Sequence, residues 1–148
     1  MTKVFLDSDV ILDFLLDRRP FAVHAGTVFA LAEHGRLSLY TTTVSFLNVL
    51  YVAESQTTKR QATTLIRKLR TLLHLLSVHE HNVDAAIQAN AADVEDHVQL
   101  ECAKENQMDV FLTRNLRHYP RDPAFIMEPE VFLGTIPDEQ IDGDIGAK

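Results

Sequence analysis

Short apolar runs alternate along the chain with longer segments of helical spacing. The short runs predict strands at residues 3–7, 37–42, 75–78, 109–113 and, weakly, 124–127. The longer segments predict helices at residues 21–34, 43–54, 58–73, 81–91 and 93–106, with a helix or turn at 10–16 and a short helix from Glu128. This alternation predicts a three-layer α/β/α fold around a mostly parallel sheet of about five strands.

Length and composition are those of one globular domain. The chain has 148 residues, of which 46% are hydrophobic and 24% charged. We expect a single domain over residues 1–134 and a flexible, acidic tail over residues 135–148. Apolar runs stay short of the roughly 20 residues that span a bilayer, and the single cysteine, Cys102, suits a reducing compartment. A soluble cytoplasmic protein with no membrane partner is therefore expected.

The net charge of −7 is unevenly distributed. Residues 1–79 carry nine Lys and Arg against six Asp and Glu, whereas residues 80–148 carry five against fifteen. A protein that binds nucleic acid through a simple basic patch is disfavoured, because phosphate affinity comes largely from Lys and Arg. Carboxylates can still meet phosphate through divalent cations, so a metal enzyme remains open.

Three acids crowd the end of the first predicted strand, at Asp7, Asp9 and Asp13. Ligands of parallel sheets bind outside the carboxyl ends of the strands, where carboxylates can hold a divalent cation. The alternative is that these acids cap the following helix. Capping competes most strongly at Asp9, and Asp13 is expected on a solvated face.

A second acidic group, Asp93-Val94-Glu95-Asp96, opens a later helix. Asp93 suits the N-cap, and a capping box would also use Asp96. Asp96 lies in register with the apolar Leu100, towards the sheet, where an acid needs a partner or a metal. We therefore favour a functional role for Asp96.

Polar residues also follow the fourth predicted strand and interrupt an apolar helix. Asn48 lies in that helix, and a local structural hydrogen bond is enough to explain it. Thr113 and Asn115 at the strand end are common structural residues. Arg114 and Arg117 lie beside them and either bind substrate phosphates or are ordinary surface arginines.

Other site classes lack their motifs. The sequence has no Gly-rich phosphate loop, no His-Glu-x-x-His and no cysteine pair, so nucleotide-loop and zinc chemistry are not expected. His79 and His81 would point to opposite sides of an extended segment. Cys102 is expected to be a buried, inert thiol.

Four segments together resemble the PIN domain, the nuclease fold of VapC-type toxins: residues 4–13, 41–48, 93–103 and 109–115. The resemblance spans roughly residues 3–133. It implies that Asp7 and Asp96 bind the metal. Asn48 stands where many members have Glu, and Asp9 matches a position that is often Asn.

The remaining positions complete the implied site. Thr113 and Asn115 match the strand-end Thr and the fourth acid, so two of four expected acids are amides here. The implied active-site residues are Asp7, Asp96, Asn115, Asn48 and Thr113, with substrate contacts from Asp9, Arg114 and Arg117.

The resemblance implies an endoribonuclease that uses Mg²⁺ or Mn²⁺ and is the toxin of a toxin–antitoxin pair. Its implied partners are RNA, a small antitoxin and a second copy of the chain, with residues 44–53 and 59–70 as candidate partner surfaces. The amides Asn48 and Asn115 favour an alternative, a scaffold that binds RNA or protein without cleavage. A minor alternative is a haloacid-dehalogenase-like phosphatase, which Asp7-Ser8-Asp9 resembles, although the later acidic pair of that family is missing.

Overall fold

The computed structural model describes residues 1–138 and 141. Within them, one sheet has the strand order β3-β2-β1-β4-β5, and every neighbouring pair is parallel. The strands are β1 (Thr2–Leu6), β2 (Leu37–Thr42), β3 (Leu73–Leu76), β4 (Val110–Leu112) and β5 (Ile126–Met127). The predicted fold class is confirmed, with a sheet that is parallel throughout.

Helices connect and cover these strands. They are α1 (Ser8–Leu15), α2 (Ala22–Glu33), α3 (Thr43–Gln56), α4 (Lys59–Leu72), α5 (Glu80–Gln88), α6 (Val94–Glu105) and α7 (Pro129–Gly134), with a 3-10 helix at Leu116–His118. Side-chain caps set two of the starts, since Thr42 accepts from the Ser45 amide and Thr58 from the Gln61 amide. Helix α2 ends before Gly35, whose φ of +74° suits glycine.

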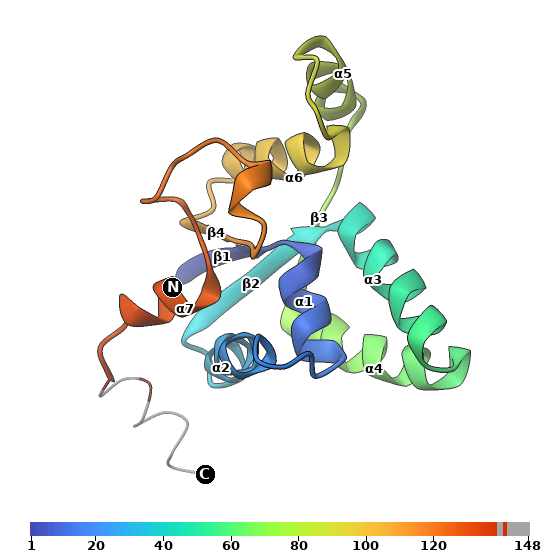
Figure 1. Ribbon diagram of the computed structural model, residues 1–148, viewed down its shortest axis with the longest axis vertical. Helices are drawn as coiled ribbons and strands as arrows, with labels where there is room; N and C mark the ends of the chain where they lie inside the picture. Colours follow the sequence, from blue (N-terminus) through green and yellow to red (C-terminus); the bar gives the residue numbers. More distant parts are fainter. Residues whose placement is uncertain (139–140, 142–148) are drawn as a thin grey trace.

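Successive residues of β1 build the two sides of the core. Val4 and Leu6 pack into the larger cluster, which includes residues of α1, α2, α3, α4 and α7. Phe5 faces the opposite side, towards α6, and stacks on Phe111 of β4 with ring centroids 4.8 Å apart. Figure 1 shows the resulting layers, with α6 and α5 on one side of the sheet and α1, α2 and α4 on the other.

The third strand starts earlier than its sequence predicted. Helix α4 ends at Leu72 and β3 begins at the next residue, whereas the apolar pattern placed the strand at 75–78. Leu73 is 2% exposed and pairs with Leu39 of β2. Because Leu73 is buried in the sheet, the chain passes from α4 to β3 without a loop. Helical periodicity alone does not show where this change occurs.

The chain after α7 lies partly in the described region. Ile136 packs against the larger core cluster. Residues 139–140 and 142–148 of the predicted tail lie outside the described residues. None of the helices described is long and apolar enough to cross a membrane.

Candidate metal centre at the carboxyl edge of the sheet

The central pair of strands brings two predicted site segments together. Leu6 of β1 pairs with Leu112 of β4, so the residues that follow them, Asp7 and Thr113, lie side by side. The Asp7 amide donates to the Leu112 carbonyl at 2.9 Å. The Thr113 hydroxyl donates to Asp7 Oδ2 at 2.8 Å. Parallel pairing thus joins residues more than one hundred positions apart in the sequence.

Asp7 lies at the centre of this edge. It is the N-cap of α1, its Oδ1 accepts from the Ser8 amide at 2.8 Å, and only 4% of the residue is exposed. Its Oδ2 accepts from the Tyr119 hydroxyl at 2.9 Å, as well as from Thr113. Asp7 therefore caps helix α1, as the capping alternative predicted. It also lies among the acids at the carboxyl edge of the sheet.

Tyr119 links the two acids that the sequence favoured. Its hydroxyl oxygen is 2.9 Å from Asp7 Oδ2 and 3.2 Å from Asp96 Oδ1. Burial, followed by the charges of Asp7 and Asp96, raises the pKa of Tyr119, so the hydroxyl stays protonated. One hydroxyl hydrogen can serve only one carboxylate at a time, so Tyr119 cannot donate to Asp7 and Asp96 at once. Sequence patterns gave no sign of Tyr119, because it follows a 3-10 helix.

Asp93 and Asp96 have separate roles. Asp93 is the N-cap of α6 and accepts from the Asp96 amide at 3.0 Å, as expected. The Asp96 side chain instead faces Tyr119 and lies 3.1 Å from Nδ1 of His118. Burial and then the charge of Asp7 raise the pKa of Asp96. The structure thus places the Asp96 carboxyl at the sheet edge beside Asp7.

Asp9 presents a buried carboxylate oxygen without a partner. Its Oδ2 accepts from the Arg114 amide and from the Asn115 side-chain amide, each at 3.0 Å. Its Oδ1 is buried and has no hydrogen-bond partner in the described part of the chain. Burial and then the charge of Asp7 raise the pKa of Asp9 to about 7. An unpaired buried carboxylate is costly, and a divalent cation is the partner that would remove the cost.

Asp13 corrects one expectation. We expected a solvated face, but Asp13 is 1% exposed and accepts two hydrogen bonds from the Arg114 guanidinium, at 2.6 and 3.0 Å. Asp13 follows Asp9 by four residues on α1 and therefore shares its face towards the end of β4. Arg114 also lies over the Phe21 ring, 4.0 Å from its centroid. The Arg114 guanidinium thus contacts both Asp13 and Phe21. Arg117, in contrast, is exposed on the 3-10 helix.

Asn48 makes a distant contact rather than a local one. Its side-chain amide on α3 donates to Oε1 of Glu95 at 2.6 Å, 47 residues away. Burial raises the pKa of Glu95, the hydrogen bond from Asn48 opposes that rise, and the charges of Asp93, Asp96 and Asp7 add to it. Glu95 was not among the predicted site residues, although it lies between Asp93, the predicted N-cap, and Asp96, a predicted metal ligand.

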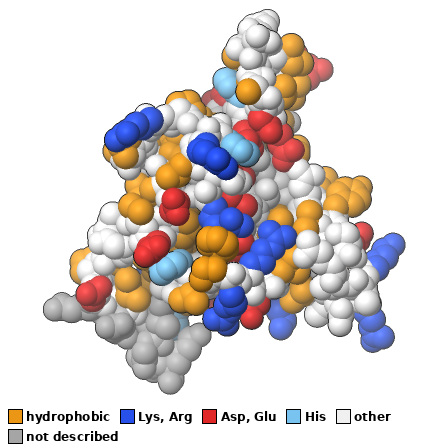
Figure 2. Space-filling model, viewed as in Figure 1, with side chains coloured by type: hydrophobic (Ala, Val, Ile, Leu, Met, Phe, Trp, Pro, Cys, Tyr) orange, Lys and Arg blue, Asp and Glu red, His pale blue; other side chains and the backbone are white. Residues whose placement is uncertain are grey.

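Together these residues suit a hard divalent cation. Asp7 follows β1, Asp9 lies in the first turn of α1, and Glu95 and Asp96 lie in the first turn of α6. Tyr119 joins Asp7 to Asp96, and carboxylate oxygen is the ligand that Mg²⁺ and Mn²⁺ prefer. Figure 2 shows acidic side chains recessed near the middle of the visible face, with basic side chains around them.

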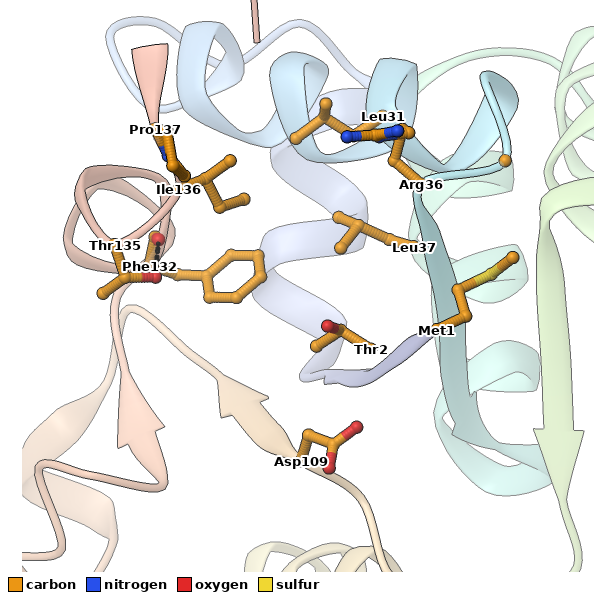
Figure 3. A pocket seen from close by; sticks show the side chains of 11 residues that line it. Met1, Thr2, Leu31, Arg36, Leu37, Asp109, Phe132, Thr135, Ile136 and Pro137 are labelled. Carbon is orange, nitrogen blue, oxygen red and sulfur yellow. Dashed lines mark hydrogen bonds between the residues drawn. The ribbon is translucent and has the colours of Figure 1, made fainter. Parts of the chain in front are cut away.

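Two other features lie away from this edge. A cavity of about 770 Å³ includes Met1, Leu37 and Asp109 at the opposite ends of the strands (Figure 3). On α5 and α6, His81, Glu101 and Glu105 have potential ligand atoms within 4.8 Å of one another. Hydrogen bonds already join this second group, since His81 and Asn82 both contact Glu105. Neither feature includes a predicted site residue.

Comparison with known proteins places the chain in a family. A PIN-domain family model matches residues 3–117. The chain belongs to the PIN domain family. PIN domains are typically nucleases and generally use divalent metal ions, so membership supports a hydrolase role. It gives no support to the phosphatase alternative.

Solved structures share the PIN fold at low sequence identity. VapBC2 from Rickettsia felis, bound to a DNA fragment from its promoter, has a TM-score of 0.63 and 11% identity, and covers 86% of this chain and 98% of its own. DNA-bound VapBC from Salmonella typhimurium has the same TM-score and coverage with 18% identity. A toxin–antitoxin complex from Klebsiella pneumoniae has a TM-score of 0.58 and 13% identity, and covers 85% and 97%. At these identities the likeness establishes the fold alone. A comparison with curated proteins finds no match.

Proposed function

We propose that this PIN domain is a cytoplasmic endoribonuclease that depends on Mg²⁺ or Mn²⁺ and is the toxin of a toxin–antitoxin pair. The observation that carries the proposal is that Asp7 and Asp96 both contact the Tyr119 hydroxyl at the carboxyl edge of the sheet, while Asp9, two residues after Asp7, has one buried carboxylate oxygen unpaired. Such an arrangement is poorly explained by stability, since like charges in a partly buried cluster repel one another.

Asp7 and Asp96 would hold the cation. A bound divalent cation supplies Lewis acidity, which lowers the pKa of a bound water and stabilises the oxygen that leaves phosphorus. Thr113 and Tyr119 fix the Asp7 carboxylate through two hydrogen bonds to the same oxygen, Oδ2. His118 holds Asp96 from the solvent side. These contacts pre-organise the acids before a cation arrives.

Two arginines have different parts in this proposal. Arg117 is exposed and directly precedes His118, which contacts Asp96, and its guanidinium can bind an RNA phosphate. Arg114 is committed to Asp13, so its main contribution is to fix the loop after β4. Its backbone amide donates to Asp9, which ties that loop to α1.

Two surfaces suit protein partners. A groove lies between α1, α2 and α4, with apolar Phe14, Leu65 and Leu72 beside basic Arg67 and Lys68. Its mixed apolar and basic lining suits an amphipathic acidic segment of an antitoxin. The similar solved structures, which are VapBC and toxin–antitoxin complexes, support such a partner.

A second surface suits a copy of the same chain. Val44, Leu47 and Tyr51 follow one another at helical spacing on α3 and are 39%, 54% and 71% exposed. An exposed apolar stripe of this kind is typical of interfaces. We therefore propose a homodimer through α3.

Cleavage of RNA by the purified chain, freed of any antitoxin, tests the function. A mixed pool of structured RNA is incubated with Mg²⁺, Mn²⁺ or EDTA, beside the variants Asp7→Asn and Asp96→Asn. Asp84→Asn, which alters an exposed acid on α5, is the matched control. We expect metal-dependent cleavage by the wild type and the control, and a loss of at least about a hundredfold in both site variants.

The alternative is a scaffold that binds RNA or protein without cleavage, as the amides Asn48 and Asn115 would suggest. Folded wild-type protein that cleaves nothing with either metal, while the double variant Asn48→Glu/Asn115→Asp does cleave, would favour the scaffold. Cleavage by the wild type that EDTA abolishes would exclude it.

A further inference from the structure

We propose that His81, Glu101 and Glu105 form a second metal site, which binds Zn²⁺ between α5 and α6. The site is separate from the acidic edge of the sheet and does not depend on the proposed nuclease function. His81 lies in the first turn of α5, and the two acids follow one another at a spacing of four residues on α6, so they share one face of that helix. Potential ligand atoms of all three side chains lie within 4.8 Å of one another.

The spacing of these atoms is close to that of a tetrahedral zinc site. His81 Nε2 is 2.9 Å from Glu105 Oε1. In a tetrahedral site with bonds of about 2.0–2.1 Å, two ligand atoms are about 3.3–3.4 Å apart. Small side-chain rotations therefore replace this hydrogen bond by two bonds to the ion, with the imidazole hydrogen on Nδ1. The fourth position is then open to water.

A buried amide holds both acids in place. Asn82 is fully buried, and its side chain donates to Glu105 Oε2 at 3.1 Å and to Glu101 Oε1 at 3.4 Å. Its own Oδ1 accepts from the His79 amide at 2.9 Å, which fixes Asn82 at the start of α5. The other oxygen of Glu101, Oε2, lies 3.8 Å from Nε2 of His97. Such outer contacts orient the ligands of a metal before it binds.

The chemistry of the ligands selects zinc over magnesium. Imidazole nitrogen suits Zn²⁺, whereas Mg²⁺ prefers a set of oxygen ligands only. Two carboxylates this close repel each other, and a divalent cation neutralises both charges. Hydrogen bonds from Asn82 and then from His81 lower the pKa of Glu105. Glu105 is therefore ionised at neutral pH, as a metal ligand must be.

A metal ion here would reinforce a small contact area between two helices. Figure 1 shows α5 lying beyond α6, away from the sheet. The apolar cluster that joins the two helices contains only Ala86, Val98 and Cys102 as buried members in the described chain. Zn²⁺ would add a polar clamp beside this cluster. Sequence motifs gave no sign of the site, because its ligands come from two different helices.

Binding of Zn²⁺ to the full chain, measured by isothermal titration calorimetry with excess Mg²⁺ to compete at the sheet edge, tests the site without any RNA. The variants are His81→Gln and Glu101→Gln. Glu80→Gln is the matched control, because Glu80 is an exposed acid next to His81. We expect each site variant to weaken Zn²⁺ binding about tenfold or more, and the control to bind as the wild type does.

A change of ligand type distinguishes coordination from a structural hydrogen bond. Glu105→His removes the carboxylate that contacts His81 and Asn82 but supplies another imidazole, which is a zinc ligand. We expect this variant to bind Zn²⁺ within a few-fold of the wild type, whereas Glu105→Gln should lose binding as His81→Gln does. Equal losses in both variants of Glu105 would contradict coordination at that position.

Hydrogen exchange tests the position of the site between the helices. Zn²⁺ at about a hundred times its Kd should slow exchange of the α5 amides about a hundredfold, because separation of α5 from α6 must first release the ion. Exchange in α5 that Zn²⁺ leaves unchanged would overturn the proposal.

The outcomes separate this site from the acidic edge of the sheet. Zn²⁺ affinity that is lost in His81→Gln and kept in Asp7→Asn is the result we expect. Affinity that is lost in Asp7→Asn and kept in His81→Gln would assign zinc to the sheet edge and overturn the second site, while the nuclease proposal would stand. His81 and Glu105 are exposed, so their variants are expected to fold.

Discussion

The buried carboxyl of Asp9 should make the metal-free protein less stable as the pH rises. Its pKa is raised from an ordinary value of 3.8 to about 7 in the folded chain. Between these values the folded state holds a proton that the unfolded state has released, so the free energy of unfolding falls with increasing pH. Integrated from pH 5 to pH 8, the loss is about 3 kcal/mol for this one group.

Urea unfolding in EDTA at pH 5 and pH 8 measures this loss. In Asp9→Asn the pH-dependent loss should be smaller by about 3 kcal/mol, whatever the substitution costs in packing, because packing costs do not vary with pH. Asp84→Asn, the exposed control, should keep the wild-type slope. Saturating Mg²⁺ should also reduce the loss in the wild type, since the cation replaces the proton as partner of Asp9. Parallel pH profiles for wild type and Asp9→Asn would refute the reasoning.

Three further predictions concern residues around the site. Tyr119→Phe removes a donor to Asp7 and should lower the free energy of unfolding in EDTA by about 1–2 kcal/mol, and by less with Mg²⁺; equal losses in both urea titrations would contradict it. Arg114→Ala leaves Asp13 buried without its partner and should lower the free energy of unfolding by about 3 kcal/mol in the same assay. Arg114→Lys should recover only part of this loss, because an ammonium cannot bind both carboxylate oxygens in a fork. A loss below about 1 kcal/mol in Arg114→Ala would argue against the ion pair. Cys102 is fully buried, with its pKa raised to about 11, so a thiol reagent such as dithionitrobenzoate should react with it only after denaturation; rapid reaction of the native protein would show otherwise.

Periodicity was enough to predict the fold, because each element buries an apolar face of its own. The alternation of short apolar runs with helical segments predicted all five strands, and the rule that ligands lie at the carboxyl ends of parallel strands directed attention to Asp7 and Thr113. Their direct contact depends on β1 and β4 being neighbours. Strand order is a property of long-range packing, so periodicity does not contain it.

Side-chain contacts between distant segments could not be predicted from the sequence either, because they too depend on long-range packing. Asp13 was expected in solvent because its partner Arg114 is 101 residues away. Tyr119 reaches Asp7 across 112 residues, and Asn48 reaches Glu95 across 47. Residue types and spacing along one helix describe local neighbours only. The role of such polar residues becomes visible once the three layers bring their elements to one edge.

Binding of a divalent cation at the acidic edge of the sheet is the central property proposed for this protein. Crystals of the wild-type chain soaked in Mn²⁺ and measured near the manganese absorption edge would locate the ion by its anomalous scattering. We predict a peak in coordination contact with Asp7 and Asp96, at the about 2.0–2.3 Å typical of such cations and oxygen ligands. A peak at His81, Glu101 and Glu105 alone, or none at the sheet edge, would contradict the claim.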